Sequence, residues 1–103
     1  MMTYQLIRYT TKPEHAASNT ELIRAVYAEL HQTNPDGLRY AAFQLSDRVT
    51  FLHLVQHEHD DKPSPLLAVK AFGEFQEGLA ERRADGPTRD ELIPIGSYRV
   101  FGS

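Results

Sequence analysis

The sequence of 103 residues predicts an α+β fold, in which a four-stranded antiparallel sheet has two helices on one of its faces. Two observations support this prediction. Strand-like and helix-like segments follow the order strand, helix, strand, strand, helix, strand, and the two central strands form a hairpin that is apolar on both sides. Right-handed crossovers turn that order into a ferredoxin-like βαββαβ arrangement with strand order 4-1-3-2. We expect residues 1–103 to form one such domain.

The first strand and the first helix are expected up to about Gln32. Residues 3–10 are rich in β-branched and aromatic side chains, which favour a strand. The helix is indicated by an apolar stripe at helical spacing, made by Leu22, Ile23, Val26, Tyr27 and Leu30. Its start has two candidate positions. Ser18 and Glu21 can form a capping box, or Pro13 can be the first helical residue.

The central hairpin, Gly37 to His57, follows a turn at residues 34–37. A two-residue turn at Asp47-Arg48 makes these facing pairs: Gln44 with Phe51, Ala42 with His53, and Tyr40 with Val55. Side chains alternate between faces. One face then holds Leu38, Tyr40, Ala42, Gln44, Phe51, His53, Val55 and His57. The other holds Ala41, Phe43, Leu45, Leu52 and Leu54. Because a face in water should be polar, we expect the helices to cover one side and a second copy of the chain the other, in a two-fold homodimer.

The second helix is expected from Pro65, capped by Ser64, to about Arg83. Its predicted buried stripe consists of Ala68, Phe72, Phe75 and Leu79. Gly73 and Gly78 weaken this helix, and either can mark a bend or a close backbone approach.

The last strand is expected at residues 91–101, after a turn at residues 84–87. Pro94 lies within it and cannot donate a backbone hydrogen bond, so an edge or a bulge is expected there.

Composition excludes several classes of function. The net charge is −3 and the basic residues are scattered, unlike the basic patch of a nucleic-acid-binding protein. Cysteine is absent, which excludes disulfides, thiol catalysis and thiolate metal sites. No apolar run approaches the ~18 residues of a membrane span, and no signal-peptide pattern is present. We expect a cytoplasmic protein without nucleic-acid or membrane partners.

Three stretches resemble a known group of proteins: Lys12-Pro13-Glu14, Pro35-Asp36-Gly37-Leu38-Arg39-Tyr40 and Gly96-Ser97-Tyr98-Arg99. With the element order, they make the chain similar to the dimeric α/β-barrel superfamily, in particular to small proteins related to antibiotic-biosynthesis monooxygenases. The resemblance implies a dimeric α/β barrel and oxidation of phenol- or quinol-type aromatics by O₂, with no metal or flavin cofactor. The best-known members use an Asn, a Trp and either a Tyr or a His. This chain has no Trp, and its expected second helix has no His, which argues against haem degradation.

Cofactor-free oxygenation requires a proton acceptor and fixed hydrogen-bond donors in a dry pocket. His53 is the first candidate because it lies mid-strand and has an ordinary pKa near neutrality. Tyr40, on the same face, and Arg8, a charge in a central strand, complete the predicted catalytic set. Arg8 then needs a partner or access to solvent. An ordinary structural role, as a core or interface histidine, is the competing interpretation of His53.

Predicted substrate-binding residues are aromatic or polar side chains of the strands and helices: Tyr9, Asn19, Tyr27, His31, Phe72 and Phe75. Core packing and helix-terminal charge are the structural alternatives for these residues. The run His57-Glu58-His59-Asp60-Asp61 contains metal-ligating side chains, but a metal requires three or four convergent ligands, and we predict no metal.

The sequence thus predicts a cofactor-independent monooxygenase acting on a small aromatic. The alternative is a non-catalytic dimer that holds a small apolar or aromatic molecule or serves assembly. A third hypothesis is an isomerase or decarboxylating enzyme in which His53 moves protons.

Overall fold

A computed structural model describes residues 3–59 and 61–99. The elements are β1 (Thr3–Thr11), the 3₁₀ turn η1 (Pro13–His15), α1 (Ala16–Thr33), β2 (Leu38–Gln44), β3 (Thr50–His57), the 3₁₀ turn η2 (Pro65–Ala68), α2 (Lys70–Glu77), α3 (Leu79–Arg82) and β4 (Arg83–Leu92). The strands form one antiparallel sheet in the order β2-β3-β1-β4. The predicted α+β fold and strand order are therefore confirmed.

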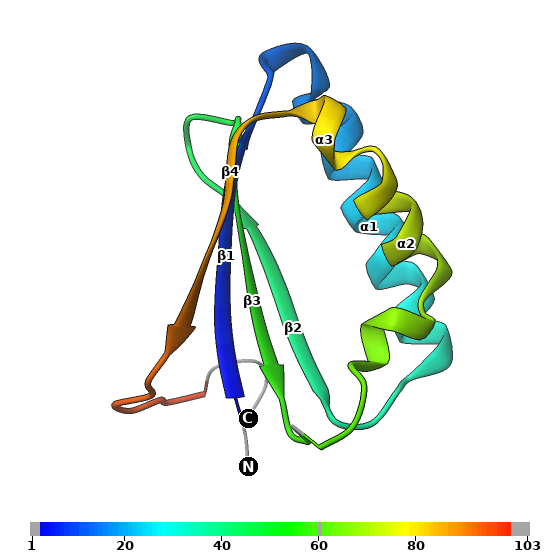
Figure 1. Cartoon of the computed structure of the whole chain (residues 1–103), viewed down its shortest axis with the longest axis vertical. Coiled ribbons are helices and arrows are strands. Elements are labelled where there is room, and N and C mark those ends of the chain that lie inside the picture. The colour runs from blue at the N-terminus through cyan, green and yellow to red at the C-terminus, as the bar shows by residue number, and fades with distance from the viewer. Residues whose placement is uncertain (1–2, 60, 100–103) are drawn as a thin grey trace.

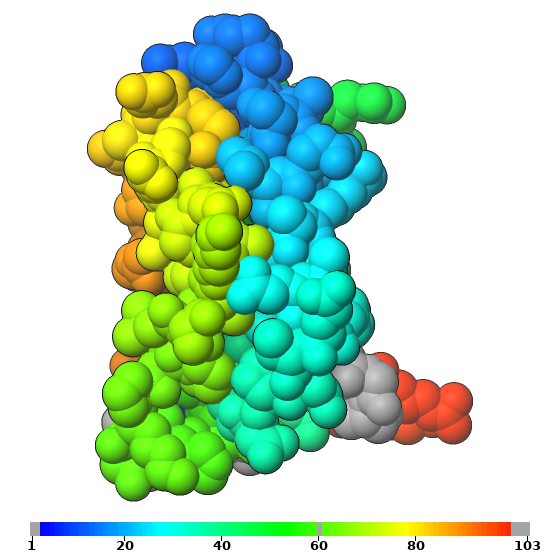
Figure 2. All heavy atoms as spheres, turned by 90° about the vertical axis from the view of Figure 1, so that its right-hand side faces the viewer, coloured from blue at the N-terminus to red at the C-terminus, as the bar shows by residue number. Residues whose placement is uncertain are grey.

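The helices form a single layer on one face of the sheet (Figure 1). Figure 2 shows this layer from outside, with α1 beside α2 and α3. The core lies between the layers and contains Tyr9, Ile23, Val26, Phe51, Val69, Ala71 and Phe75. No helix in the described ranges is long and apolar enough to cross a membrane.

The predicted register of the central hairpin is confirmed, with Gln44 opposite Phe51 and Ala42 opposite His53. Asp47 stabilises the turn, because its carboxylate accepts hydrogen bonds from the backbone N–H of Val49 (3.0 Å) and of Thr50 (2.9 Å). This register fixes which side chains of β2 and β3 face the helices.

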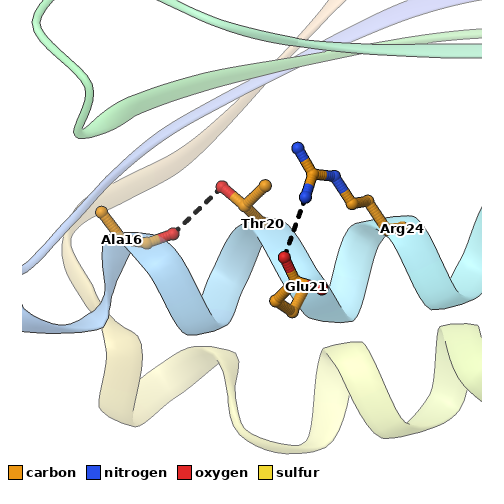
Figure 3. Close-up of polar contacts among 4 residues, drawn as sticks. All are labelled: Ala16, Thr20, Glu21 and Arg24. Carbon is orange, nitrogen blue, oxygen red and sulfur yellow. Dashed lines mark hydrogen bonds and ion pairs between the residues drawn. The ribbon is translucent and has the colours of Figure 1, made fainter.

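The first helix begins with Pro13, which opens η1, and α1 follows at Ala16. The capping box does not form. Glu21 pairs instead with Arg24 at 2.9 Å, and the Thr20 hydroxyl donates to the carbonyl of Ala16 at 3.1 Å (Figure 3). The earlier of the two candidate starts is therefore the observed one.

The second helical region is not continuous, contrary to the prediction. The Ser64 cap does form, since the backbone N–H of Leu66 donates to its hydroxyl at 3.3 Å. The chain is extended at Val69, and Gly78 separates α2 from α3. The interruption at Val69 leaves Ala68 exposed, so the predicted stripe begins instead at the buried Ala71.

The last strand also differs from the prediction, because β4 begins at Arg83 and ends at Leu92. Residues 84–87 are not a turn. They belong to β4 at a bulge, where Gly86 has φ +88° and lies against the β1 backbone; a Cβ there would come 2.9 Å from the carbonyl oxygen of Arg8. Residues 93–99, including Pro94, form no strand, and residues 100–101 of the predicted strand lie outside the described residues.

Candidate functional site

A cavity of about 240 Å³ lies between the sheet and the helical layer. All four strands contribute to its wall, and η2, α2 and α3 close the opposite side. The residues that line it are mostly apolar: Gln5, Ile7, Tyr9, Tyr40, His53, Val55, His57, Ser64, Leu66, Leu67, Phe72, Phe75, Gln76, Leu79, Pro87 and Arg89. An apolar hollow with a few polar groups is the usual form of a small-molecule site.

A chain of hydrogen bonds runs through the core and ends in the wall of this cavity. Arg82 Nε donates to Asn19 Oδ1 at 3.0 Å, and Asn19 Nδ2 donates to the Tyr9 hydroxyl at 2.9 Å. The Tyr9 hydroxyl lies 2.9 Å from His53 Nε2, and the Tyr40 hydroxyl lies 2.5 Å from His53 Nδ1. We call these five residues the buried relay. They connect α3, α1 and three strands.

Strand alternation explains why three of these side chains meet. Tyr9 faces Phe51 across β1 and β3, and Tyr40 faces Val55 across β2 and β3. His53 is two residues from each of those partners, so it is the diagonal neighbour of both tyrosines on the helix side of the sheet. Diagonal pairs of long side chains are within contact distance.

The two helical members of the relay are buried polar groups that satisfy each other. Asn19 is 0% exposed and Arg82 is 6% exposed. Arg82 Nη2 also donates to the carbonyl of Phe75 at 2.6 Å, and its guanidinium lies 5.2 Å from the centre of the Phe75 ring. A buried cation without such partners would be strongly destabilising. These contacts hold Arg82 in one position.

Burial sets the charge state of the relay. It lowers the pKa of His53 to about 4, so the imidazole is neutral at pH 7. Burial raises the pKa of Tyr9 to about 12, partly offset by the Asn19 hydrogen bond and the Arg82 charge, and raises the pKa of Tyr40 above its ordinary range. Both hydroxyls therefore keep their protons at neutral pH.

Aromatic rings pack around His53 and Tyr40 in the wall of the cavity. Phe72 and Phe75 stack with centroids 6.2 Å apart, and Phe72 meets Tyr40 edge-on at 6.5 Å. The His53 ring lies 5.5 Å from that of Phe75. Flat walls of this kind suit a planar ligand, because aromatic pairs favour offset stacking and edge contacts.

The structure brings together six of the predicted site residues: His53, Tyr40, Tyr9, Asn19, Phe72 and Phe75. All six belong to the relay or to the cavity wall. Their predicted roles in catalysis and substrate binding stay predictions.

Three predicted site residues lie elsewhere. Arg8 is exposed on the opposite face of the sheet, because it follows Ile7 and precedes Tyr9, whose side chains face the helices. Tyr27 stacks on Tyr40 at 5.1 Å, but it lines two other hollows, one of which it shares with the exposed His31.

Two arginines were missed by the sequence reasoning. Arg82 was expected only as part of the end of a helix, and Arg89 lay between an expected turn and an expected strand. Arg89 is the one arginine or lysine among the described residues that line the cavity. The alternation of β4 would have placed Arg89 on the helix side only if the strand had been started correctly.

A metal centre finds no support in the described residues, which contain no group of three or more metal-binding side chains. His57 Nε2 instead lies 2.8 Å from the Ser64 hydroxyl. Asp60, which belongs to the same His- and Asp-containing run, lies outside the described residues.

The fold and site define a small α+β domain with an aromatic-lined cavity between its sheet and its helices. No family model matches the sequence, and no curated protein matches it. Solved structures do match it over almost the full length. A candidate antibiotic biosynthesis monooxygenase from Nitrosomonas europaea has a TM-score of 0.73 at 11% identity, covering 91% of this chain and 90% of that chain.

Two further matches have the same extent. A candidate antibiotic biosynthesis monooxygenase from Caulobacter crescentus has a TM-score of 0.71 at 15% identity, covering 92% of this chain and 91% of that chain. A conserved protein from Methanosarcina mazei has a TM-score of 0.71 at 13% identity, covering 89% and 91%. The chain therefore has the ferredoxin-like fold of antibiotic biosynthesis monooxygenase domains, as the resemblance implied.

Proposed function

We propose that the chain is a cofactor-independent monooxygenase that oxidises a small phenol- or quinol-type aromatic in the relay cavity. The observation that supports this most is the position of the buried relay, which ends in the wall of an otherwise apolar, aromatic-lined cavity. An engineered cavity of about 150 Å³ holds benzene, so about 240 Å³ has room for a substituted ring.

The proposed reaction needs no external reductant. A phenol with a free para carbon and one O₂ give a para-quinone and one water. The carbon loses its hydrogen and gains one oxygen atom, and the second oxygen atom leaves as water with that hydrogen and the phenolic one. All electrons come from the substrate. The chain would hold the ionised substrate oxygen by hydrogen bonds and exclude bulk water with apolar walls.

The low basicity of His53 narrows the substrate class. Its pKa of about 4 lies about 6 units below that of an ordinary phenol, near 10, which corresponds to roughly 8 kcal/mol for direct proton transfer. His53 is therefore a hydrogen-bonding group here, not a strong base. The substrate we infer is an acidic phenol or enol that enters as its anion, and Arg89 supplies the positive charge in the cavity wall.

The test is oxidation of 1-naphthol and anthrone, which both offer a phenolic or enolic ring with a free para carbon, under ¹⁸O₂, with O₂ uptake and mass spectrometry of the product. We expect one ¹⁸O atom in the anthrone product, formed faster than without protein, and a large loss of rate in Tyr40→Phe. Tyr98→Phe, at a tyrosine that does not line the cavity, is the matched control. A rate equal to that of buffer, or equal rates in Tyr40→Phe and wild type, would contradict the proposal.

A second candidate is a non-catalytic module that holds a small aromatic molecule. The observation in its favour is that both ring nitrogens of His53 already have hydrogen-bond partners. Native mass spectrometry of freshly purified protein tests it. A retained aromatic ligand together with no oxidation of either probe would favour this candidate.

We also propose that a second copy of the chain covers the helix-free face of the sheet. This face presents partly exposed apolar side chains on three strands: Tyr4, Leu6, Ala41, Phe43, Leu52 and Leu54. Phe43 is 52% exposed. Residues 93–99 extend beyond β4 with Ile93, Ile95 and Tyr98 exposed, and a partner would bury them (Figure 1). Arg8 and Asp90 give the face both charge signs, which suits a surface that meets itself.

Sedimentation equilibrium tests the dimer. Wild type is expected as a dimer and Leu54→Arg as a monomer, whereas Gln32→Arg, on the exposed end of α1, should stay dimeric. A folded wild-type monomer at high concentration would contradict this proposal.

A further inference from the structure

The direction of the hydrogen bonds in the buried relay follows from Arg82. A guanidinium has only donors, so the atom of Asn19 that faces Arg82 must be the carbonyl oxygen. The Asn19 amide nitrogen therefore faces Tyr9 and donates to its hydroxyl oxygen.

The next two steps follow from the chemistry of a neutral imidazole. Because the Tyr9 oxygen already accepts from Asn19, its own proton is directed to His53 Nε2. A neutral imidazole has one N–H, which is then on Nδ1 and donates to the Tyr40 oxygen. The opposite direction would leave the proton of the buried Tyr9 hydroxyl without an acceptor, which folded proteins avoid.

We propose that Tyr40 presents its hydroxyl proton to the cavity, that the cavity therefore selects ligands with an acceptor oxygen at this point, and that Arg82 is the positioning residue that sets this preference. Within the described part of the chain, the only hydrogen-bond partner of the Tyr40 hydroxyl is His53 Nδ1. Tyr40 lines the cavity, whereas Arg82 does not. The inference rests on the proposed function only in taking this cavity as the ligand site.

Asn19→Asp reverses the relay with almost no change of shape. A carboxylate only accepts, so it would take the protons of both Arg82 and Tyr9. The Tyr9 oxygen would then accept from His53 Nε2, and Nδ1 would accept the Tyr40 proton. Tyr40 would offer the cavity only a lone pair.

The first test is the tautomer of His53, read by ¹⁵N NMR of histidine-labelled protein at neutral pH, with the signal assigned by its loss in His53→Gln. Wild type is expected to have its proton on Nδ1 and Asn19→Asp on Nε2. Arg82→Met should weaken the preference, and Arg82→Lys should restore part of it. A wild-type proton on Nε2 overturns the inference, and this result needs no variant to fold.

The second test compares two ligands of the same shape, acetophenone and α-methylstyrene, which differ by a carbonyl oxygen in place of a methylene group. Wild type is expected to bind acetophenone about tenfold more tightly, as one buried hydrogen bond predicts. The preference should disappear in Tyr40→Phe and fall in Asn19→Asp.

The outcomes separate the two proposals. A preference for acetophenone without oxidation of either probe phenol contradicts the monooxygenase and leaves the relay inference standing. Oxidation with no preference contradicts the relay inference alone.

Discussion

Arg82 Nε donates a hydrogen bond to Asn19 Oδ1 at 3.0 Å, although the two residues are 63 positions apart in the sequence. The contact joins the end of the helical layer to the start of α1, and both side chains are buried. Its consequence reaches the cavity through Tyr9 and His53, because each donor in the relay fixes the next. A packing contact between helices therefore determines the direction of the Tyr40 hydroxyl proton in the cavity, although Arg82 itself does not line that cavity.

Gly78→Ala is expected to disturb this contact. A Cβ at Gly78 would come 2.5 Å from Arg82 Nη1, so the guanidinium must shift, although its Nε and Nη2 are bonded to Asn19 and Phe75. We expect a loss of about 1–3 kcal/mol in the free energy of unfolding, the cost of leaving buried polar groups unpaired. Urea unfolding measures it.

Gly73→Ala is the matched control, because a Cβ there meets nothing within 4 Å. Within α2 the same change should stabilise the protein by about 0.5–1 kcal/mol. Equal effects of the two substitutions would mean that Arg82 moves without cost.

Glu29 forms a cap that joins the two helices. Its carboxylate accepts from the backbone N–H of Lys70 (2.8 Å) and of Ala71 (2.9 Å), at the N-terminus of α2. Glu29→Ala should cost about 1 kcal/mol of stability, as for the loss of a helix N-cap, and should increase hydrogen exchange in α2. Glu77→Ala, at an exposed position, should change neither quantity. Unchanged exchange in Glu29→Ala would show that α2 does not depend on this cap.

The sequence was sufficient for the sheet because strand signals are local. Alternation and one turn determined the register of β2 and β3, and therefore the face of Tyr40 and His53. The breaks in the second helical region depend on non-local contacts. Glu29 lies 41 residues before Lys70, so the residues near position 70 in the sequence do not reveal that α2 has this cap.

The part of the candidate site that could be predicted is the part set by the alternation of strand side chains between the two faces of the sheet. Tyr9, Tyr40 and His53 converge because all three point to the helix side of the sheet. The same rule excludes Arg8 beside Tyr9, since neighbouring strand residues face opposite sides. Arg82 was not predictable, because its role depends on a partner brought close only by the complete fold.

Tyr27 and Tyr9 are expected to respond in opposite directions to the same substitution. Within the described part of the chain, the buried Tyr27 hydroxyl has no hydrogen-bond partner, so Tyr27→Phe removes a desolvated polar group and should stabilise the protein by about 1 kcal/mol. Tyr9→Phe keeps the ring but leaves Asn19 Nδ2 and His53 Nε2 without a partner, at a cost of about 1–3 kcal/mol. Thermal and urea unfolding of both variants decide this. A destabilising Tyr27→Phe would indicate that its hydroxyl is bonded in solution.

The stability of the protein should fall on acidification because of His53. Burial lowers its pKa from an ordinary value of 6.5 to about 4, so the unfolded chain binds a proton between those values that the folded chain does not. The stabilisation is therefore complete above about pH 6.5 and is lost as the pH falls toward about 4. The shift corresponds to about 3 kcal/mol.

Urea unfolding at several values between about pH 7 and 4 measures this loss, and the expected slope approaches about 1.4 kcal/mol per pH unit. His53→Phe is expected to be less stable at neutral pH and to lose most of the slope, because the proton-binding difference is gone. His31→Gln, at an exposed histidine, should keep the wild-type slope. An unchanged slope in His53→Phe would assign the pH dependence to other groups and would mean that folding does not lower the pKa of His53.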